Sequence, residues 1–219
     1  MRQTLMAALA IALMLVACTM PAAEQSAKPP DPAKAAGTLP DGWKARLDDP
    51  LAKANAASAV AERESLKFKS GPAGIYYKPD MKAERDYELT AAFSQLEPSV
   101  PPEPYGLFIS GVDLDKEVPR YTAFLIRQDG KYRISSHNGD KAVVIVDWAS
   151  APQMADPKGV KTSNTLTIRA QQAAVHFLVG EKEVHQMPRA RAGGDGIAGV
   201  RIGKDLHVQV DKLAVKKFP

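Results

Sequence analysis

The chain has 219 residues, of which 45% are hydrophobic, 25% charged and 6% aromatic. This length suits one sizeable domain, or a smaller domain with a tail, and the hydrophobic fraction is too high for a disordered chain. The formal net charge of +4 is spread along the sequence, so it lacks the basic cluster typical of nucleic-acid-binding proteins. Beyond the first eighteen residues, no stretch is long and apolar enough to span a bilayer.

Residues 1–17 have the organisation of a secretory signal: Arg2 supplies a positive charge and an apolar run of about a dozen residues follows it. At the end of this segment, residues 15–18 are Leu-Val-Ala-Cys, which resembles the lipobox of bacterial lipoproteins. In that family the Cys thiol is joined to diacylglycerol, the peptide is cut before the Cys, and the new amine is acylated. Cys18 is the single Cys of the chain, so it cannot form an intramolecular disulfide. We expect a lipid anchor of acyl chains such as palmitate at Cys18; an ordinary signal peptide with an incidental Cys is the alternative.

Residues 18–42 carry five prolines and many alanines, a composition typical of a semi-stiff spacer. We therefore expect a tether that holds the domain at 43–219 away from a membrane. Thr19 follows the Cys, where the Asp of an inner-membrane retention signal would stand. By analogy this favours the outer membrane of a bacterial envelope, with the domain in the periplasm.

From Trp43 onward the sequence consists of short apolar or alternating runs separated by turn residues, which is typical of β-strands. We expect strands over 43–48, 65–70, 74–77, 87–95, 105–110, 121–128, 131–137, 143–147, 164–170, 173–179, 197–202 and 207–215.

Turn signals join several of these runs into hairpins. Asp129-Gly130 predicts a hairpin with a type I′ turn, and Asn138-Gly139 predicts the next one in the same way. A third hairpin is expected around Gly180. Only 51–64, which is Ala-rich without Gly or Pro, is predicted to be helical. Because strands do not alternate with helices, the sequence predicts an all-β, antiparallel jelly-roll sandwich with at most one short helix.

Five motifs within this region occur in a recognisable order: YGLFISGVDL at 105–114, YTAFLIRQDGKY at 121–132, NTLTI at 164–168, VHFLVG at 175–180 and GIAGVR at 196–201. This order resembles the concanavalin A-like jelly roll of the laminin-G and 3-keto-disaccharide hydrolase-like domains, over about 65–215. The sequence departs from their pattern at Gly180-Glu181, where that hairpin usually carries Asn-Gly. The motifs are turns and core strands, so they specify a fold and imply little about activity.

The sequence contains few motifs typical of catalytic or metal-binding sites. Family 16 glycosidases on this jelly roll have Glu-x-Asp-x-Glu on one strand, and no such run occurs here. The pairs Glu62/Glu64 and Glu181/Glu183 are expected to be solvated charges. Asp113 and Asp115 could contribute to a calcium site as in some laminin-G domains, although a turn-forming pair is the more ordinary interpretation.

Residues 194–199 match G-x-G-x-x-G, but a strand is expected after them instead of the helix that a dinucleotide site requires. The four histidines share no i, i+4 spacing, which gives zinc no support. We therefore expect no cofactor, no metal and no nucleic-acid partner.

The last expected strand supplies a candidate ligand site. Alternation places His207, Gln209 and Asp211 on one face. It places the apolar residues on the other face, toward the core: Leu206, Val208 and Val210. The polar set could bind sugar hydroxyls, or it could be an ordinary solvated sheet face.

Two further residues are candidates for this site. Arg201, on the preceding strand, could reach the same face, although alternation there does not decide its direction. Trp148 ends an apolar run near a loop and is the better of the two tryptophans as a sugar platform, with a structural, half-buried Trp as the alternative.

These features favour a non-catalytic carbohydrate-binding or envelope interaction module, with saccharide implied as ligand class by the resemblance. The alternatives are an enzyme that acts on 3-keto-disaccharides, and a structural lipoprotein that binds another envelope protein. The sequence does not decide the oligomeric state.

Overall fold

The computed structural model describes residues 39–52, 57–154 and 162–218, and all of them lie in one compact unit. Two antiparallel sheets of seven strands each form a sandwich, with one four-residue helix. The predicted all-β jelly-roll class is therefore confirmed. The expected signal peptide, the acylated Cys18 and most of the tether lie outside the described residues. Among the residues described, no helix is both long and apolar enough to cross a bilayer.

The first sheet, sheet A, has the strand order β1-β4-β13-β6-β7-β8-β9. Its strands in that order are β1 (Lys44–Leu47), β4 (Gly74–Ala83), β13 (Gly196–Ile202), β6 (Tyr105–Val112), β7 (Arg120–Arg127), β8 (Lys131–Asn138) and β9 (Lys141–Ser150).

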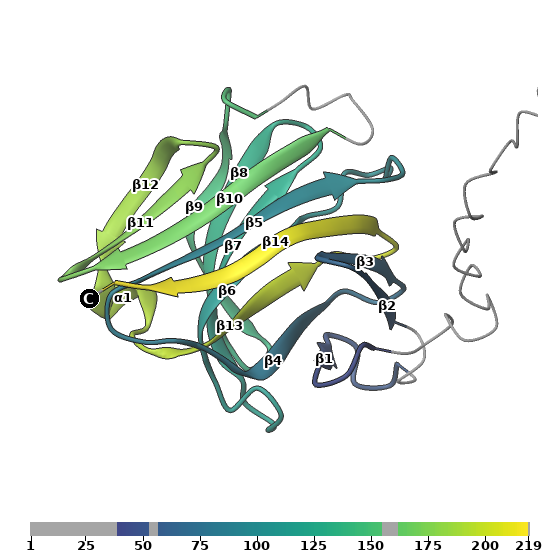
Figure 1. Cartoon of the computed structure of the whole chain (residues 1–219), viewed down its shortest axis with the longest axis horizontal. Helices are drawn as coiled ribbons and strands as arrows, with labels where there is room; N and C mark the ends of the chain where they lie inside the picture. Colours follow the sequence, from purple (N-terminus) through teal and green to yellow (C-terminus); the bar gives the residue numbers. More distant parts are fainter. Residues whose placement is uncertain (1–38, 53–56, 155–161, 219) are drawn as a thin grey trace, which may run out of the picture. The chain divides into compact units, whose positions relative to one another are not determined.

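The second sheet, sheet B, has the order β12-β11-β10-β5-β14-β3-β2, and Figure 1 shows β12 to β3 running side by side. Its strands in that order are β12 (Lys182–Pro188), β11 (Ala174–Val179), β10 (Ser163–Gln171), β5 (Tyr87–Gln95), β14 (His207–Lys217), β3 (Ser65–Ser70) and β2 (Ala57–Glu62).

The main core lies between the sheets and follows from strand alternation. In β5, Tyr87, Leu89, Ala91 and Phe93 are at most 1% exposed, while the alternate residues between them, Glu88, Thr90 and Ala92, are partly exposed. This strand of sheet B thus presents its apolar side to the facing sheet and its more polar side outward. About 25 cal/mol per Å² of apolar surface removed from water makes this the main source of stability.

Sheet A departs from this pattern because its outer face is also apolar. A second buried cluster lies there, away from the main core. Its buried members are Ile75, Tyr77, Phe108, Leu114, Tyr121, Ala123 and Leu125. As a result β7 is buried on both faces, and its sequence YTAFLI has no apolar–polar alternation.

All three predicted hairpins are present, but the predicted type I′ turn between β7 and β8 is wrong. Arg127 pairs with Lys131, so the connection has three residues, 128–130. Only Gly130 of these has positive φ, at 77°, whereas a type I′ turn needs positive φ at two consecutive residues. A three-residue loop that ends in a left-handed Gly satisfies the same Asp-Gly sequence.

The helix predicted over 51–64 is also wrong for the part that the structure describes. Residues 57–62 form β2, which pairs with β3 through a tight turn at Arg63, whose φ is 57°. Edge pairing in sheet B thus overrides the helix propensity of alanine.

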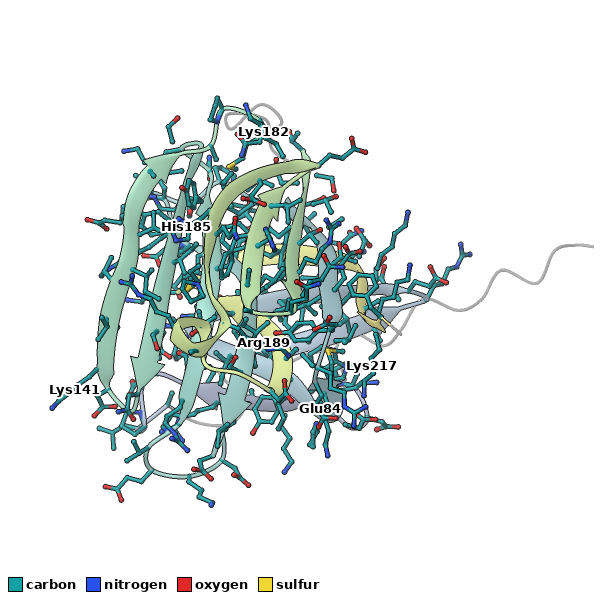
Figure 2. All side chains as sticks on the ribbon, turned by 90° about the vertical axis from the view of Figure 1, so that its left-hand side faces the viewer. Glu84, Lys141, Lys182, His185, Arg189 and Lys217 are labelled. Atoms are coloured by element: carbon teal, nitrogen blue, oxygen red, sulfur yellow. The ribbon has the colours of Figure 1, made fainter. Side chains whose placement is uncertain are left out.

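Within the described ranges, the helix α1 (Arg189–Ala192) follows β12. Arg189, labelled in Figure 2, donates from Nη1 to Asp86 at 3.2 Å and from Nη2 to Asp195 at 2.8 Å. It therefore connects the β4–β5 turn to the segment that precedes β13. Glu84 and Lys217, also labelled, form an ion pair of 3.6 Å between that turn and the end of β14.

Candidate functional site

A pocket of about 360 Å³ opens on the outer face of sheet A. Tyr121 of β7, His137 of β8 and Arg201 of β13 line it from the sheet. The segment that follows β1 and the turn between β8 and β9 supply further lining residues, among them Asp48, Pro50 and Asp140. Charged, aromatic and apolar groups therefore meet in one small concavity.

Tyr121 and His137 are brought together by the β7–β8 hairpin, in which they are directly opposite each other. Their rings are stacked, with centroids 4.4 Å apart and planes 7° apart. The ring of Phe108, on β6, packs against Tyr121 with its centroid 5.4 Å away. Ser135 Oγ lies 3.0 Å from His137 Nε2. The two pocket aromatics are thus fixed by packing and by a hydrogen bond.

Arg201 organises the polar side of the pocket. Its side chain is 14% exposed, and its Nη1 donates to Asp48 Oδ1 at 3.0 Å and to the Tyr121 hydroxyl at 2.9 Å. Nη2 donates to the other oxygen of Asp48, so the pair is bidentate. Asp48 N also donates to Ala73 O at 2.8 Å, which fixes the segment that carries the carboxylate. The pocket therefore offers fixed donors and acceptors side by side.

Burial keeps the ring groups of the pocket neutral. The pKa of His137 is lowered to about 4, first by burial and then by the positive charge of Arg201. Burial raises the pKa of Tyr121 to about 12, against the opposing effect of Arg201. At neutral pH the two rings are therefore an uncharged imidazole and an uncharged phenol, next to the Arg201–Asp48 ion pair.

One wall is braced by Arg46 of β1, which donates to the carbonyl of Lys116 and, at 3.2 Å, to that of Glu117. Asp113 in the same β6–β7 loop pairs with Lys116 at 2.7 Å and with Arg120 at 3.5 Å. These cations lower the pKa of Asp113. No group of three potential metal-ligating side chains occurs among the described residues.

The polar residues predicted on the last strand lie elsewhere, on the outer face of sheet B. Val208 and Val210 are buried in the main core, so the predicted alternation of β14 is confirmed. His207 Nδ1 lies 3.1 Å from Glu97 Oε1, and Gln209 Nε2 donates to Asp211 Oδ1 at 3.0 Å. Each of these polar side chains thus has a partner within the protein. Ligand binding by His207, Gln209 and Asp211 stays a prediction.

The expectation that Arg201 shares that face is wrong, because β13 belongs to sheet A and β14 to sheet B. The structure instead places Arg201 and Trp148 on the same outer face of sheet A. Trp148 packs against the apolar cluster there. The guanidinium carbon of Arg127 lies 4.1 Å from the centre of its ring, and that of Arg133 lies 5.7 Å away.

Sequence reasoning missed Tyr121, His137 and Asp48 as site residues. One usable signal was the unbroken apolar run YTAFLI, which indicates a strand covered on both faces. The contact between Asp48 and Arg201 joins residues 153 positions apart, so no local sequence pattern predicts it.

The fold and its pocket define a concanavalin A-like, or galectin-like, β-sandwich with a polar concavity on one sheet. No protein-family model matches the sequence, and no curated protein matches it. Solved structures share the fold at low identity. A carbohydrate-binding module, CBM66, from Bacillus subtilis has a TM-score of 0.59 at 10% identity, over 80% of this chain and 96% of that one.

Two other structures are similar. A Bacillus subtilis protein of unknown function with a galectin-like fold has a TM-score of 0.58 at 12% identity, covering 80% of this chain and 89% of that chain. An endo-β-1,3-glucanase from Pyrococcus furiosus has a TM-score of 0.55 at 8% identity, covering 81% and 88%. At these identities the likeness establishes the architecture alone.

Proposed function

We propose that this protein is an envelope lipoprotein, anchored through Cys18, whose sandwich binds glycans without catalysis in the pocket of sheet A. The observation that carries the proposal is the Arg201–Asp48 pair, joined by the Tyr121 hydroxyl, within a pocket that also has apolar lining. Sugar hydroxyls both donate and accept, so they suit adjacent guanidinium, carboxylate and phenol groups. The apolar lining suits the C–H faces of sugar rings.

The pKa values favour binding over catalysis. A general acid or base works best when its pKa is near the operating pH. His137 has a pKa of about 4 and Tyr121 one of about 12, so neither is tuned for proton transfer at neutral pH. Asp48 is engaged by Arg201. The alternative of a hydrolase for 3-keto-disaccharides therefore has less support than a binding module.

The test is a glycan array and titration calorimetry with the purified chain, including β-1,3-glucan and alginate oligosaccharides. Tyr121→Phe removes one hydroxyl and keeps the stack on His137, and Asp48→Asn removes the charge while keeping the shape. We expect each to weaken glycan binding about tenfold, the effect of one charge-assisted hydrogen bond. Tyr77→Phe, on the same sheet face outside the pocket lining, is the matched control and should bind normally.

Three results would count against the proposal. One is a wild-type chain that binds no glycan. Another is binding that survives both pocket changes but is lost in His207→Ala with Asp211→Ala, which would place the site on sheet B. The third is release of products from a 3-keto-disaccharide, which would make the protein an enzyme.

A further inference from the structure

The outer face of sheet A continues beyond the pocket along β7 and β8. Tyr121 and His137 lie at one end of the hairpin, and Leu125 and Arg133 are directly opposite each other four residues further along. Four residues of strand span about 13 Å. That length exceeds one sugar ring, so a ligand that reaches both ends must consist of several linked units.

Trp148 marks the far end of this strip. It is partly buried, and Arg127 lies over its ring at 4.1 Å. Arg127 is itself fixed by Asp129, with Nε 3.0 Å from Oδ1, and this contact lowers the pKa of Asp129. The indole is thus held in one orientation before any ligand arrives, which reduces the entropy lost on binding.

Arg133 lies between the pocket and Trp148, and its hydrogen-bonding groups are not all satisfied by the described residues. Within the part of the chain that the structure describes, its buried Nε has no hydrogen-bond partner. The carboxylate of Asp147 is 3.8 Å away and 79% exposed, so it neutralises Arg133 poorly. The Arg133 side chain as a whole is 31% exposed, so its guanidinium group can donate to a ligand oxygen above β8.

We infer that the ligand is an extended glycan chain of at least three sugar units, which fills the pocket at Tyr121 and continues across Arg133 to Trp148. This inference rests on the proposed glycan-binding function and adds the class of ligand, an internal stretch of polysaccharide, as distinct from a single sugar. The pocket supplies orientation through fixed polar groups. Trp148 supplies a separate increment of affinity, available only to the longer ligands.

The test measures affinity by calorimetry for β-1,3-linked glucose oligomers and for alginate oligomers of two to six units, with the full chain. Whichever of the two oligomer series binds, we expect its four-unit oligomer to bind about ten times more tightly than its two-unit oligomer. Trp148→Ala should abolish this rise and leave the affinity for the two-unit oligomer unchanged. Trp148→Phe, which keeps an aromatic ring, should retain part of the rise, and Arg133→Lys should reduce it because the planar fork is lost.

The outcomes separate this inference from the function on which it rests. An affinity that is the same for all lengths, or a Trp148→Ala loss that is equal for short and long oligomers, overturns the extended ligand and leaves the pocket function standing. Failure of the wild-type chain to bind oligomers of any length overturns both. Because Trp148→Ala could disturb packing, its melting temperature is compared with that of Trp148→Phe, and only a variant that folds normally is scored.

Discussion

His137 shows how surrounding groups decide the chemistry of a single residue. An exposed His would be partly charged near pH 6.5, but here it is stacked on Tyr121, bonded to Ser135 and close to Arg201. The charged form would lose hydration and meet a like charge. The ring therefore serves as a flat, neutral part of the pocket.

This arrangement makes stability depend on pH. The pKa of His137 is about 4 in the folded chain, against about 6.5 in an unfolded one. Between these values the unfolded chain binds the proton and the folded chain does not. The free energy of unfolding should therefore fall as pH drops through 6.5 and stop falling from this source near pH 4, by about 3 kcal/mol in total.

His137→Phe keeps a ring on Tyr121 and removes the titration, so its stability should be flatter over the same range in urea denaturation. Carboxylates such as Glu97, whose pKa is lowered by His207, titrate in both proteins and cancel in the comparison. Equal slopes for the two proteins between pH 4 and 6.5 would contradict this account of His137.

At the residue scale, the sequence predicted Arg201 and Trp148 as polar and aromatic candidates but assigned Arg201 to the wrong surface. Alternation gives the relative faces of residues within one strand, and it says nothing about which sheet the strand joins. Alternation therefore predicted correctly which residues of β14 face the core, but it could not show that β13, with Arg201, belongs to the other sheet.

At the scale of elements, most strands were predictable because they combine an apolar period with turn residues at their ends; β2 was not predicted as a strand. Two of them, β3 and β5, match their predicted ranges residue for residue. The helix expected over 51–64 failed because Ala propensity is weak beside the hydrogen bonds that a neighbouring strand supplies. The two sheets and their strand order depend on long-range pairing, such as β14 between β3 and β5, which local patterns do not contain.

Two glycines provide a test of how tightly these elements pack. In β13, a Cβ on Gly199 would lie 2.4 Å from Tyr76 O and 2.7 Å from Phe108 Cε1. Gly199→Ala should therefore lower the free energy of unfolding by about 3 kcal/mol, the upper part of the range for overpacking.

The matched control is Gly180→Ala in the β11–β12 turn, where φ is 61° and no atom lies within 4 Å. Only backbone strain applies there, which costs about 1 kcal/mol. Thermal and urea denaturation measure both variants. Equal effects of the two changes would show that the close approach of β4 and β6 to β13 is not what requires glycine at 199.

At the scale of the whole molecule, the described domain includes residues before β1. Leu39 and Trp43 pack against the main core, and the Trp43 ring meets Phe68 edge to face at 6.1 Å. A variant that begins at Leu39 should therefore be about 2 kcal/mol more stable than one that begins at Lys44, because partial burial of two large side chains is kept. Differential scanning calorimetry makes the comparison, and identical melting temperatures would show that these contacts add nothing.

The proposed anchor is also a property of the whole chain. Cys18→Ala should release the protein from membranes under a carbonate wash and abolish labelling by a palmitate analogue, since two or three acyl chains provide the membrane affinity. Cys18→Ser, which offers a hydroxyl in place of the thiol, should behave in the same way. Firm membrane association with unchanged labelling in either variant would contradict acylation at Cys18.

The three-residue turn between β7 and β8 has a consequence for how insertions and deletions act on this domain. Surface loops usually tolerate changes of length, and residues 128–130 lie at the end of the hairpin opposite to the pocket. Deletion of Gln128 would leave Asp129-Gly130 as a two-residue loop between Arg127 and Lys131, so Tyr121 would stay opposite His137. Deletion of Leu125, inside β7, would instead place Tyr121 opposite Ser136, because the remaining part of the strand would slip by one residue. A one-residue slip turns side chains to the other face, so Tyr121 would leave the pocket for the core side. The turn thus tolerates a change of length that the strand next to it does not.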